Sequence, residues 1–322
     1  MSVLGRLLVA MPRRAVAALG AALGAVLFAL RIRRGVVLRN LRLAFPEKTE
    51  AERLAIARGT YRNLGQMALD FLRIPFIPRG ELERIFVYQG WENYERARAR
   101  GLGVVACTGH FGNFEILAAA HTMRGVPITM ITKKGAGGLW RGARARAGVE
   151  DLVVGGGDTL KAAGRALQAG RVLGYVIDQN DPSRRAIFPT FFGVPCATAP
   201  TPAYIAQRNG AAVVFCLSYP LDDGRHQVVI EGPLEVPDTG DRHADALAFM
   251  QDLNDRLERY VRLQPERWYW LHRRWKRRGP ANSTSNANAP PPSTALSTST
   301  STTTTTATTT ATTTTTTTAR KN

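Results

Sequence analysis

The sequence contains little cysteine, and its three cysteines are not paired in a metal-binding or redox motif. Cys107, Cys196 and Cys216 include no CxxC pair, and their number is odd. This pattern argues against a zinc site and against a disulfide framework. We expect reduced, buried thiols in a protein that faces the cytosol.

Motifs of several enzyme classes are also missing. The chain has no GxSxG serine elbow and no GK[ST] phosphate loop. The glycines of "KKGAGG" and "VGGGDT" do not follow a dinucleotide-binding spacing. We interpret them as turns and a loop, with phosphate binding as an alternative. No protein nucleophile is evident, which favours direct attack by a substrate hydroxyl on an activated carbonyl.

Acidic residues are absent from both ends of the chain. Residues 1–46 contain eight arginines and no Asp or Glu, and residues 280–322 contain one Arg, one Lys and no acid. The formal net charge is +18, of which the C-terminal residues contribute only two charges. The remaining surplus indicates an anionic partner: nucleic acid, anionic lipid or a phosphorylated substrate.

Composition divides the chain into three parts. Residues 280–322 are rich in Thr, Ser, Pro and Ala and have almost nothing to bury, so we expect a Thr-rich disordered tail. Residues 1–34 are predicted to form an N-terminal membrane anchor. Residues 35–279 remain, and they suffice for one large α/β domain.

The anchor is predicted from one apolar run. "AVAALGAALGAVLFAL" lies between Arg14 and Arg31. Its 16 residues fall slightly short of the ~20 that span a bilayer. A signal peptide, a helix lying on the membrane and a single span over residues 15–32 are the alternatives, and the dense arginines after the run argue against export. We favour the span. More arginines follow it than precede it, so the body should face the cytoplasm from the inner membrane.

Hydrophobic patterning predicts the fold class. Residues 50–71 carry apolar side chains at alternating three- and four-residue steps, which indicates a helix. From residue 103 onward, strand-like and helix-like stretches alternate. "AAVVFCLSY" and "RHQVVIE" are predicted to pair antiparallel through "PLDDG". The expected fold is α/β, with a layered, mostly parallel (mixed) sheet flanked by helices.

The stretch "CTGHFGNFE" places chemistry where a predicted strand gives way to a helix. His110 lies in the turn, and Glu115 falls in the first turns of the helix. A carboxylate on one imidazole nitrogen would fix the tautomer and leave the other nitrogen free to accept a proton. Strand ends of this kind carry the chemistry of α/β folds. A capping or core histidine is the alternative.

Four segments together resemble a known family. "VVLRNLRLAFPEKTEAER", "TGHFGNFE", "GYVIDQNDPSRRAIFPTFFGVPCATAPTPAYIAQRNGAAVV" and "PERWYWLHRRWKRR" occur in the order found in the bacterial lipid A late acyltransferases. Those lauroyl and myristoyl transferases acylate a lipid A precursor. The resemblance covers roughly residues 1–278 and makes residues 35–279 an acyltransferase domain. It implies transfer from an acyl carrier protein thioester to a hydroxyl of a 3-hydroxyacyl chain, with no metal and no bound cofactor.

The resemblance also implies roles for individual residues. His110 would be the general base and Glu115 the acid that orients it. An arginine on the following helix would stabilise the oxyanion. "WRGARARAG" offers Arg141, Arg144 and Arg146 for this role, and Arg144 fits best. Arg146 is assigned to substrate binding, with a solvated helix face as the alternative. Asp178 matches a family aspartate that either binds substrate or ends a buried strand.

The C-terminal segment "RWYWLHRRWKRR" interleaves aromatic and basic side chains. Its aromatic residues are predicted to lie at a lipid interface, with Arg273 and Arg274 on headgroups. Inward packing of the aromatics and stacking on nucleic acid are the alternatives.

Three classes of function remain open at this point. The preferred one is the lipid A acyltransferase, whose partners are acyl carrier protein, a phosphorylated glycolipid and the membrane, but not nucleic acid. The second is an acyltransferase for another membrane acceptor, such as a lysophospholipid, a glycolipid or an ornithine lipid. The third is a non-enzymatic basic protein that binds membranes or nucleic acid.

Overall fold

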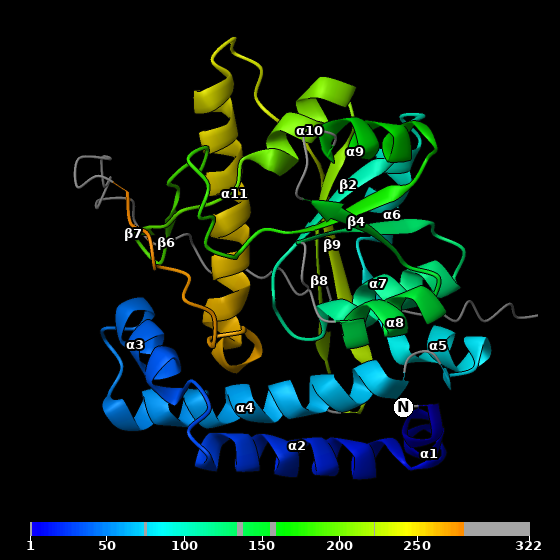
Figure 1. The fold of residues 1–322 in the computed structure, drawn as a ribbon, viewed down its shortest axis with the longest axis vertical. Coiled ribbons are helices and arrows are strands. Elements are labelled where there is room, and N and C mark those ends of the chain that lie inside the picture. The colour runs from blue at the N-terminus through cyan, green and yellow to red at the C-terminus, as the bar shows by residue number, and fades with distance from the viewer. Residues whose placement is uncertain (1, 74–75, 134–137, 155–158, 222, 280–322) are drawn as a thin grey trace, which may run out of the picture. The chain divides into compact units, whose positions relative to one another are not determined.

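A computed structural model describes residues 2–73, 76–133, 138–154, 159–221 and 223–279. The predicted tail over 280–322 lies outside the described residues, as do most of the glycines of "KKGAGG" and "VGGGDT". Within the described ranges the chain forms a mixed α/β fold, as the patterning predicted (Figure 1).

The centre of the fold is one seven-stranded sheet. Its strands are β1 (Phe86–Gln89), β2 (Val104–Thr108), β3 (Ile128–Lys133), β4 (Glu150–Val154), β5 (Val172–Val176), β8 (Val213–Pro220) and β9 (His226–Leu234). They lie in the order β1-β9-β8-β2-β5-β3-β4. Every neighbouring pair is parallel except β8 and β9, which pair antiparallel. The prediction of a mostly parallel, mixed sheet is therefore confirmed.

Helices cover both faces of this sheet (Figure 1). One face carries α9 (Thr159–Gln168), α10 (Thr201–Asn209) and α11 (Arg242–Leu263), and the other carries α6 (Trp91–Arg98), α7 (Phe114–Met123) and α8 (Gly138–Arg146). Successive residues of β2 alternate between the two layers, because strand side chains point to opposite faces. Val104 packs with the α7 layer, and Val105 and Cys107 pack with the α11 layer.

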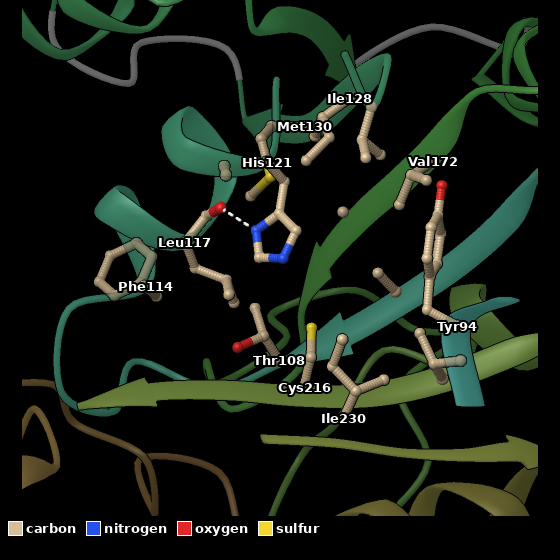
Figure 2. A pocket seen from close by; sticks show the side chains of 15 residues that line it. Tyr94, Thr108, Phe114, Leu117, His121, Ile128, Met130, Val172, Cys216 and Ile230 are labelled. Atoms are coloured by element: carbon tan, nitrogen blue, oxygen red, sulfur yellow. Dashed lines mark hydrogen bonds between the residues drawn. The ribbon is translucent and has the colours of Figure 1, made fainter. Parts of the chain in front are cut away.

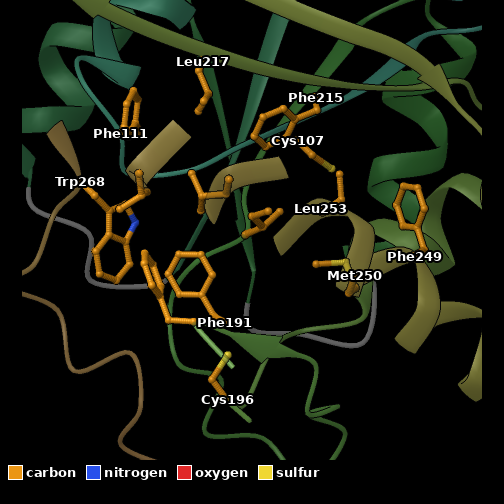
Figure 3. Packing of buried hydrophobic residues seen from close by; sticks show 14 of the residues in the cluster. Cys107, Phe111, Phe191, Cys196, Phe215, Leu217, Phe249, Met250, Leu253 and Trp268 are labelled. Carbon is orange, nitrogen blue, oxygen red and sulfur yellow. The ribbon is translucent and has the colours of Figure 1, made fainter. Parts of the chain in front are cut away.

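The α11 layer is the larger core (Figure 3). Leu253 and Met250 of α11 point toward Cys107 and Phe215 from the sheet. Shorter elements complete the fold: α5 (Arg79–Ile85), a two-stranded ribbon of β6 (Thr190–Phe191) and β7 (Val194–Pro195), and a 3-10 turn at Pro265–Arg267. This packing fixes the carboxyl ends of β2 and β5, where the candidate site lies.

The N-terminal helices are α1 (Ser2–Ala10), α2 (Arg13–Ala29), α3 (Arg34–Ala44) and α4 (Glu50–Arg73). Helix α2 lies along α4 (Figure 1), and glycines allow the close approach. A Cβ atom on Gly24 would lie 2.1 Å from the Tyr61 carbonyl oxygen, and one on Gly65 would lie 2.0 Å from the Gly20 carbonyl oxygen. The buried stripe of α2 is thus made of small residues at four-residue spacing.

The predicted single helix over residues 15–32 is not continuous. Helix α2 ends at Ala29, and Arg31 and Arg33 adopt left-handed backbone angles, with φ of 58° and 56°. In the part of the chain that the structure describes, no helix by itself is long and apolar enough to cross a membrane. Helices α2 and α3 pass that test only as a pair, which is bent by 95°.

Candidate active site

The candidate site lies where two neighbouring parallel strands end. Thr108 closes β2 and pairs in register with Val176, which closes β5. His110 follows β2 by two residues, and Asp178 follows β5 by two residues. The chain leaves β2 through α7 on one face and leaves β5 toward α10 on the other. Such a switch point leaves a crevice at the carboxyl edge of an α/β sheet.

Asp178 holds the imidazole of His110. Its Oδ1 lies 2.6 Å from Nδ1 of His110, and its Oδ2 accepts from the His110 backbone N–H at 2.8 Å and from the Trp268 indole N–H at 2.7 Å. Burial by itself would raise the pKa of Asp178, but His110 and these hydrogen bonds hold that pKa at about 2. The carboxylate is therefore ionised and keeps a proton on Nδ1, so Nε2 presents a lone pair.

The free edge of the imidazole faces a polar side chain and two rings. The Gln179 side-chain nitrogen lies 3.1 Å from Nε2 of His110, where the amide N–H donates to the lone pair. Phe114 contacts the ring edge-on at 4.7 Å between centroids, and Tyr269 lies at 5.9 Å. The His110 side chain is 16% exposed, so a substrate group can reach it at this edge.

Glu115 does not take the place that its spacing predicted. It is 5% exposed and accepts two hydrogen bonds from Arg144, Nε to Oε2 at 2.8 Å and Nη2 to Oε1 at 2.5 Å. Asn113 caps α7 by accepting from the Ile116 backbone N–H at 3.1 Å, so the helix begins only at Phe114. The prediction that Glu115 orients His110 is wrong in this geometry, because Asp178 occupies Nδ1.

The predicted oxyanion arginine is also engaged elsewhere. Arg144 is 8% exposed, and besides Glu115 it binds Asp151, with Nη1 to Oδ1 at 3.1 Å. Its guanidinium thus bridges two carboxylates, and this packing corrects the expectation that it faces a reacting carbonyl. Arg146, the last residue of α8, is exposed. The nearby Arg141 is half-buried, and its Nε and Nη2 have no hydrogen-bond partner among the described residues.

The C-terminal aromatic and basic segment packs inward instead of forming a lipid surface. Trp268, Trp270 and Trp275 are buried, and Figure 3 shows Trp268 beside Phe191. Arg274 is fully buried and donates to four acceptors: the carbonyl oxygens of Gln179 and Ala197 at 3.0 Å each, the Thr198 hydroxyl at 2.7 Å and Oδ1 of Asn254 at 3.5 Å. The predicted headgroup role of Arg274 is wrong, because its guanidinium N–H groups donate to the chain that follows β5 and are not available to a lipid.

Arg273, the other predicted headgroup residue, is exposed.

Two residues of the site were not predicted from the sequence. One is Gln179, and the other is Trp268 in its role as a hydrogen-bond partner of Asp178. Gln179 could have been found, because it directly follows a polar residue at a strand end. The contact of Trp268 spans 90 residues of sequence, and no local spacing indicates it.

An apolar cavity of about 60 Å³ opens between α7 and the sheet (Figure 2). Phe114, whose ring contacts His110, lines it together with Leu117 and Met130. His121 also lines it, with Nδ1 donating to the Leu117 carbonyl oxygen at 2.6 Å. Burial lowers the pKa of His121 to about 4, so the ring is neutral and the cavity carries no charge at neutral pH. Such a lining suits hydrocarbon.

The described residues contain no group of three or more His, Cys, Asp or Glu side chains arranged to hold a metal ion. The site consists of the His110–Asp178 pair, the Gln179 amide and the apolar cavity.

Comparisons with known proteins agree with the resemblance seen in the motifs. Residues 2–277 match the family model described as bacterial lipid A biosynthesis acyltransferase. Lipid A biosynthesis lauroyltransferase of Escherichia coli (strain K12) is 27% identical over 279 residues, which is 84% of this chain and 89% of that protein. Lipid A biosynthesis palmitoleoyltransferase of the same organism is 24% identical over 260 residues, 79% of this chain and 82% of that protein.

A solved structure was also compared. The 1-acyl-sn-glycerophosphate acyltransferase PlsC of Thermotoga maritima aligns with 77% of this chain and 98% of its own, at 12% identity and a TM-score of 0.35. The family match over nearly all of the described residues is the decisive comparison. This chain belongs to the bacterial lipid A biosynthesis acyltransferase family.

Proposed function

We propose that this protein transfers a fatty acyl group from an acyl carrier protein thioester to a hydroxyl of a 3-hydroxyacyl chain on a lipid A precursor. His110 acts as the general base. The observation that supports this role is the His110–Asp178 pair at the carboxyl ends of β2 and β5. A hydroxyl is a weak nucleophile near neutral pH, and a positioned base accelerates its attack by about 10²–10⁴-fold.

The proposed reaction has two steps. The substrate hydroxyl first displaces the Gln179 amide from the lone pair of Nε2. Nε2 of His110 then takes the hydroxyl proton while the hydroxyl oxygen forms a bond to the thioester carbonyl carbon, which gives a tetrahedral oxyanion. Collapse of that intermediate breaks the carbon–sulfur bond, and His110 returns the proton to the departing thiolate. Asp178 stabilises the imidazolium between these steps, since it remains ionised beside Nδ1.

We propose Gln179 as the donor to the oxyanion. Its amide nitrogen lies 3.1 Å from Nε2 of His110, so it is within reach of atoms that react at that nitrogen. Arg144 is a positioning residue in this proposal, because its guanidinium is bound by Glu115 and Asp151. The part of the acyl chain next to the thioester is assigned to the apolar cavity, which begins at Phe114 beside His110.

We further propose that the body faces the cytoplasm at the inner membrane and that α1 and α2 contact the lipid. Of the ten exposed large apolar side chains in the described ranges, eight belong to residues 3–32. The opposite stripe of α2 is packed on α4 through Gly20 and Gly24, which leaves the exposed stripe for lipid. A reporter fused after Arg278 should be active in the cytoplasm; periplasmic activity would refute this orientation.

The function is tested by incubating membranes that contain the protein with acyl carrier protein thioesters and a tetra-acylated lipid A precursor. Mass spectrometry should show one added acyl chain. His110→Ala should abolish the added mass, and His243→Ala, an exposed histidine on α11, is the matched control. Parallel reactions with a lysophospholipid and an ornithine lipid test the alternative acceptors. Full activity of a folded His110→Ala protein would eliminate the mechanism.

A further inference from the structure

A second, polar cavity of about 280 Å³ lies where α2, α4, the start of α7 and the β8–β9 turn meet. The mechanism proposed above makes no use of it. Within the described part of the chain, the charged residues that line it are four arginines and two aspartates: Arg13, Arg14, Arg73, Arg267, Asp70 and Asp223.

The arginines of this lining are only partly paired. Arg13 is paired with Glu81 at 3.0 Å, while Arg267 lies 3.8 Å from Glu266. The closest pairing inside the cavity is long, 3.5 Å between Arg73 Nη1 and Asp70 Oδ1. Asp223 is instead paired at 2.6 Å with Arg225, which does not line the cavity, and it neutralises little of the lining. An anion would complete the pairing of these arginines.

Two buried side chains have nitrogen atoms without a hydrogen-bond partner among the residues that the structure describes. Arg73 is 6% exposed, and its Nε has no hydrogen-bond partner. His226 is 5% exposed, and its Nδ1 has none. Burial is the main reason that the pKa of His226 falls to about 4, and the charges of Arg267, Arg13 and Arg73 lower it further. Leaving a buried charged donor unpaired is unfavourable, so these atoms indicate a bound group.

The cavity is connected to the reacting histidine through one short segment. Asn113, which caps α7, lines the cavity three residues after His110. The Gly112 backbone N–H donates to the Arg267 carbonyl oxygen at 2.8 Å, so the segment and the cavity wall are bonded together. Arg14 enters the cavity from α2, the helix whose outer stripe is apolar. A lipid beside α2 would therefore present its headgroup here.

We propose that this cavity binds a phosphate group of the substrate that reacts at His110, an assignment that rests on the proposed function. Arginine is the preferred partner for phosphate, because its planar donors match two oxygens at once. The acceptor lipid is the expected source, and the acyl donor is the second possible source of the same chemistry.

The test compares Arg14→Gln and Arg73→Gln with Arg208→Gln, an exposed arginine on α10 that does not line the cavity. Steady-state kinetics are measured with the phosphorylated lipid A precursor and with its dephosphorylated form, while the acyl donor is varied separately. Each cavity variant should raise KM for the phosphorylated acceptor about 10-fold or more, with kcat nearly unchanged. With the dephosphorylated acceptor, variant and wild type should not differ, and Arg208→Gln should be silent throughout.

A binding measurement separates this proposal from the proposed function. Line broadening of inorganic phosphate in ³¹P NMR should be seen with the wild-type protein in detergent and be lost in Arg14→Gln. If the wild-type protein transfers no acyl group to lipid A, the proposed function fails. Loss of the phosphate line broadening in Arg14→Gln would still support the assignment of the cavity to phosphate. A raised KM for the acyl donor alone would assign the phosphate to the donor. If Arg73→Gln does not fold, Arg14→Gln decides, because Arg14 is exposed. Unchanged KM values together with unchanged broadening would overturn the proposal.

Discussion

Asp178→Asn is the sharpest test of the proposed base, because it changes one atom of the pair. Asp178 accepts three hydrogen bonds at its two oxygens, from the backbone and ring of His110 and from Trp268. An asparagine has one acceptor oxygen, so its NH₂ group must face one of these donors. If it faces the ring, Nδ1 must become the acceptor and Nε2 must carry the proton, which leaves no base.

We expect this change to lower kcat by about 10³–10⁴-fold, since a wrong tautomer in a serine protease triad costs about 10⁴. KM should change little, because Asp178 is 2% exposed and lies behind the imidazole. The assay is single-turnover acyl transfer to the lipid A precursor, with Asp238→Asn, an exposed carboxylate, as the matched control.

The same substitution has a consequence for stability. The pKa of Asp178 lies at about 2 instead of the usual 3.8, which corresponds to on the order of 2 kcal/mol in favour of the folded state. Because the folded-state pKa is the lower one, this contribution is present above pH 3.8 and is lost as the pH falls toward 2. Urea unfolding in detergent should show this acid-dependent loss of unfolding free energy in the wild-type protein and not in Asp178→Asn. A variant with normal turnover and a normal acid response would refute the pairing as the basis of catalysis.

Three further predictions concern the surroundings of the site. Glu115→Ala and Arg144→Ala should each destabilise the fold by about 3–5 kcal/mol, since each leaves a buried charge unpaired; denaturant unfolding should show that the double variant loses less than the sum. Gly24→Leu should detach α2 from α4, because its Cβ would meet a backbone oxygen at 2.1 Å, and limited proteolysis should then cleave after α2; Gly35→Leu, where nothing lies within 4 Å, is the control. Truncation after Gly279 should keep acyl transfer within about tenfold of wild type; a larger loss would show that the Thr-rich residues matter.

The sheet was predictable because its signals are local. Apolar runs of strand length alternate with helical periodicity along the chain, and both patterns depend on neighbouring residues alone. The antiparallel pairing of β8 and β9 was predictable from the short "PLDDG" connection. The interruption after Ala29 was not, because Arg31 and Arg33 adopt left-handed angles that residue type does not favour.

The partners within the site were less predictable than their positions. His110 was identified from its place after a predicted strand, but its carboxylate partner, Asp178, follows another strand and lies 68 residues later in the sequence. The sequence offered Glu115 at a plausible distance along the chain, and proximity along the chain does not determine contact in space. The aromatic and basic segment was misinterpreted for a related reason. Its alternation of aromatic and basic residues is compatible with a lipid surface, and only the tertiary packing shows that Arg274 donates hydrogen bonds to carbonyl oxygens.

The position of Glu115 explains how a glutamate five residues after the histidine can matter without touching it. Glu115 sits in the first turn of α7, where a negative charge is favoured by the helix dipole, and Arg144 ties it to α8. That ion pair fixes the start of α7, which carries Phe114 toward the apolar cavity and Asn113 toward the polar one. His110 lies four residues before Phe114, the first residue of α7, so a shift of α7 would displace the proposed base from both cavities at once. If Glu115 positions α7 through its ion pair with Arg144 of α8, a carboxylate is required five residues after His110. A direct hydrogen bond from Glu115 to the imidazole would require the same spacing.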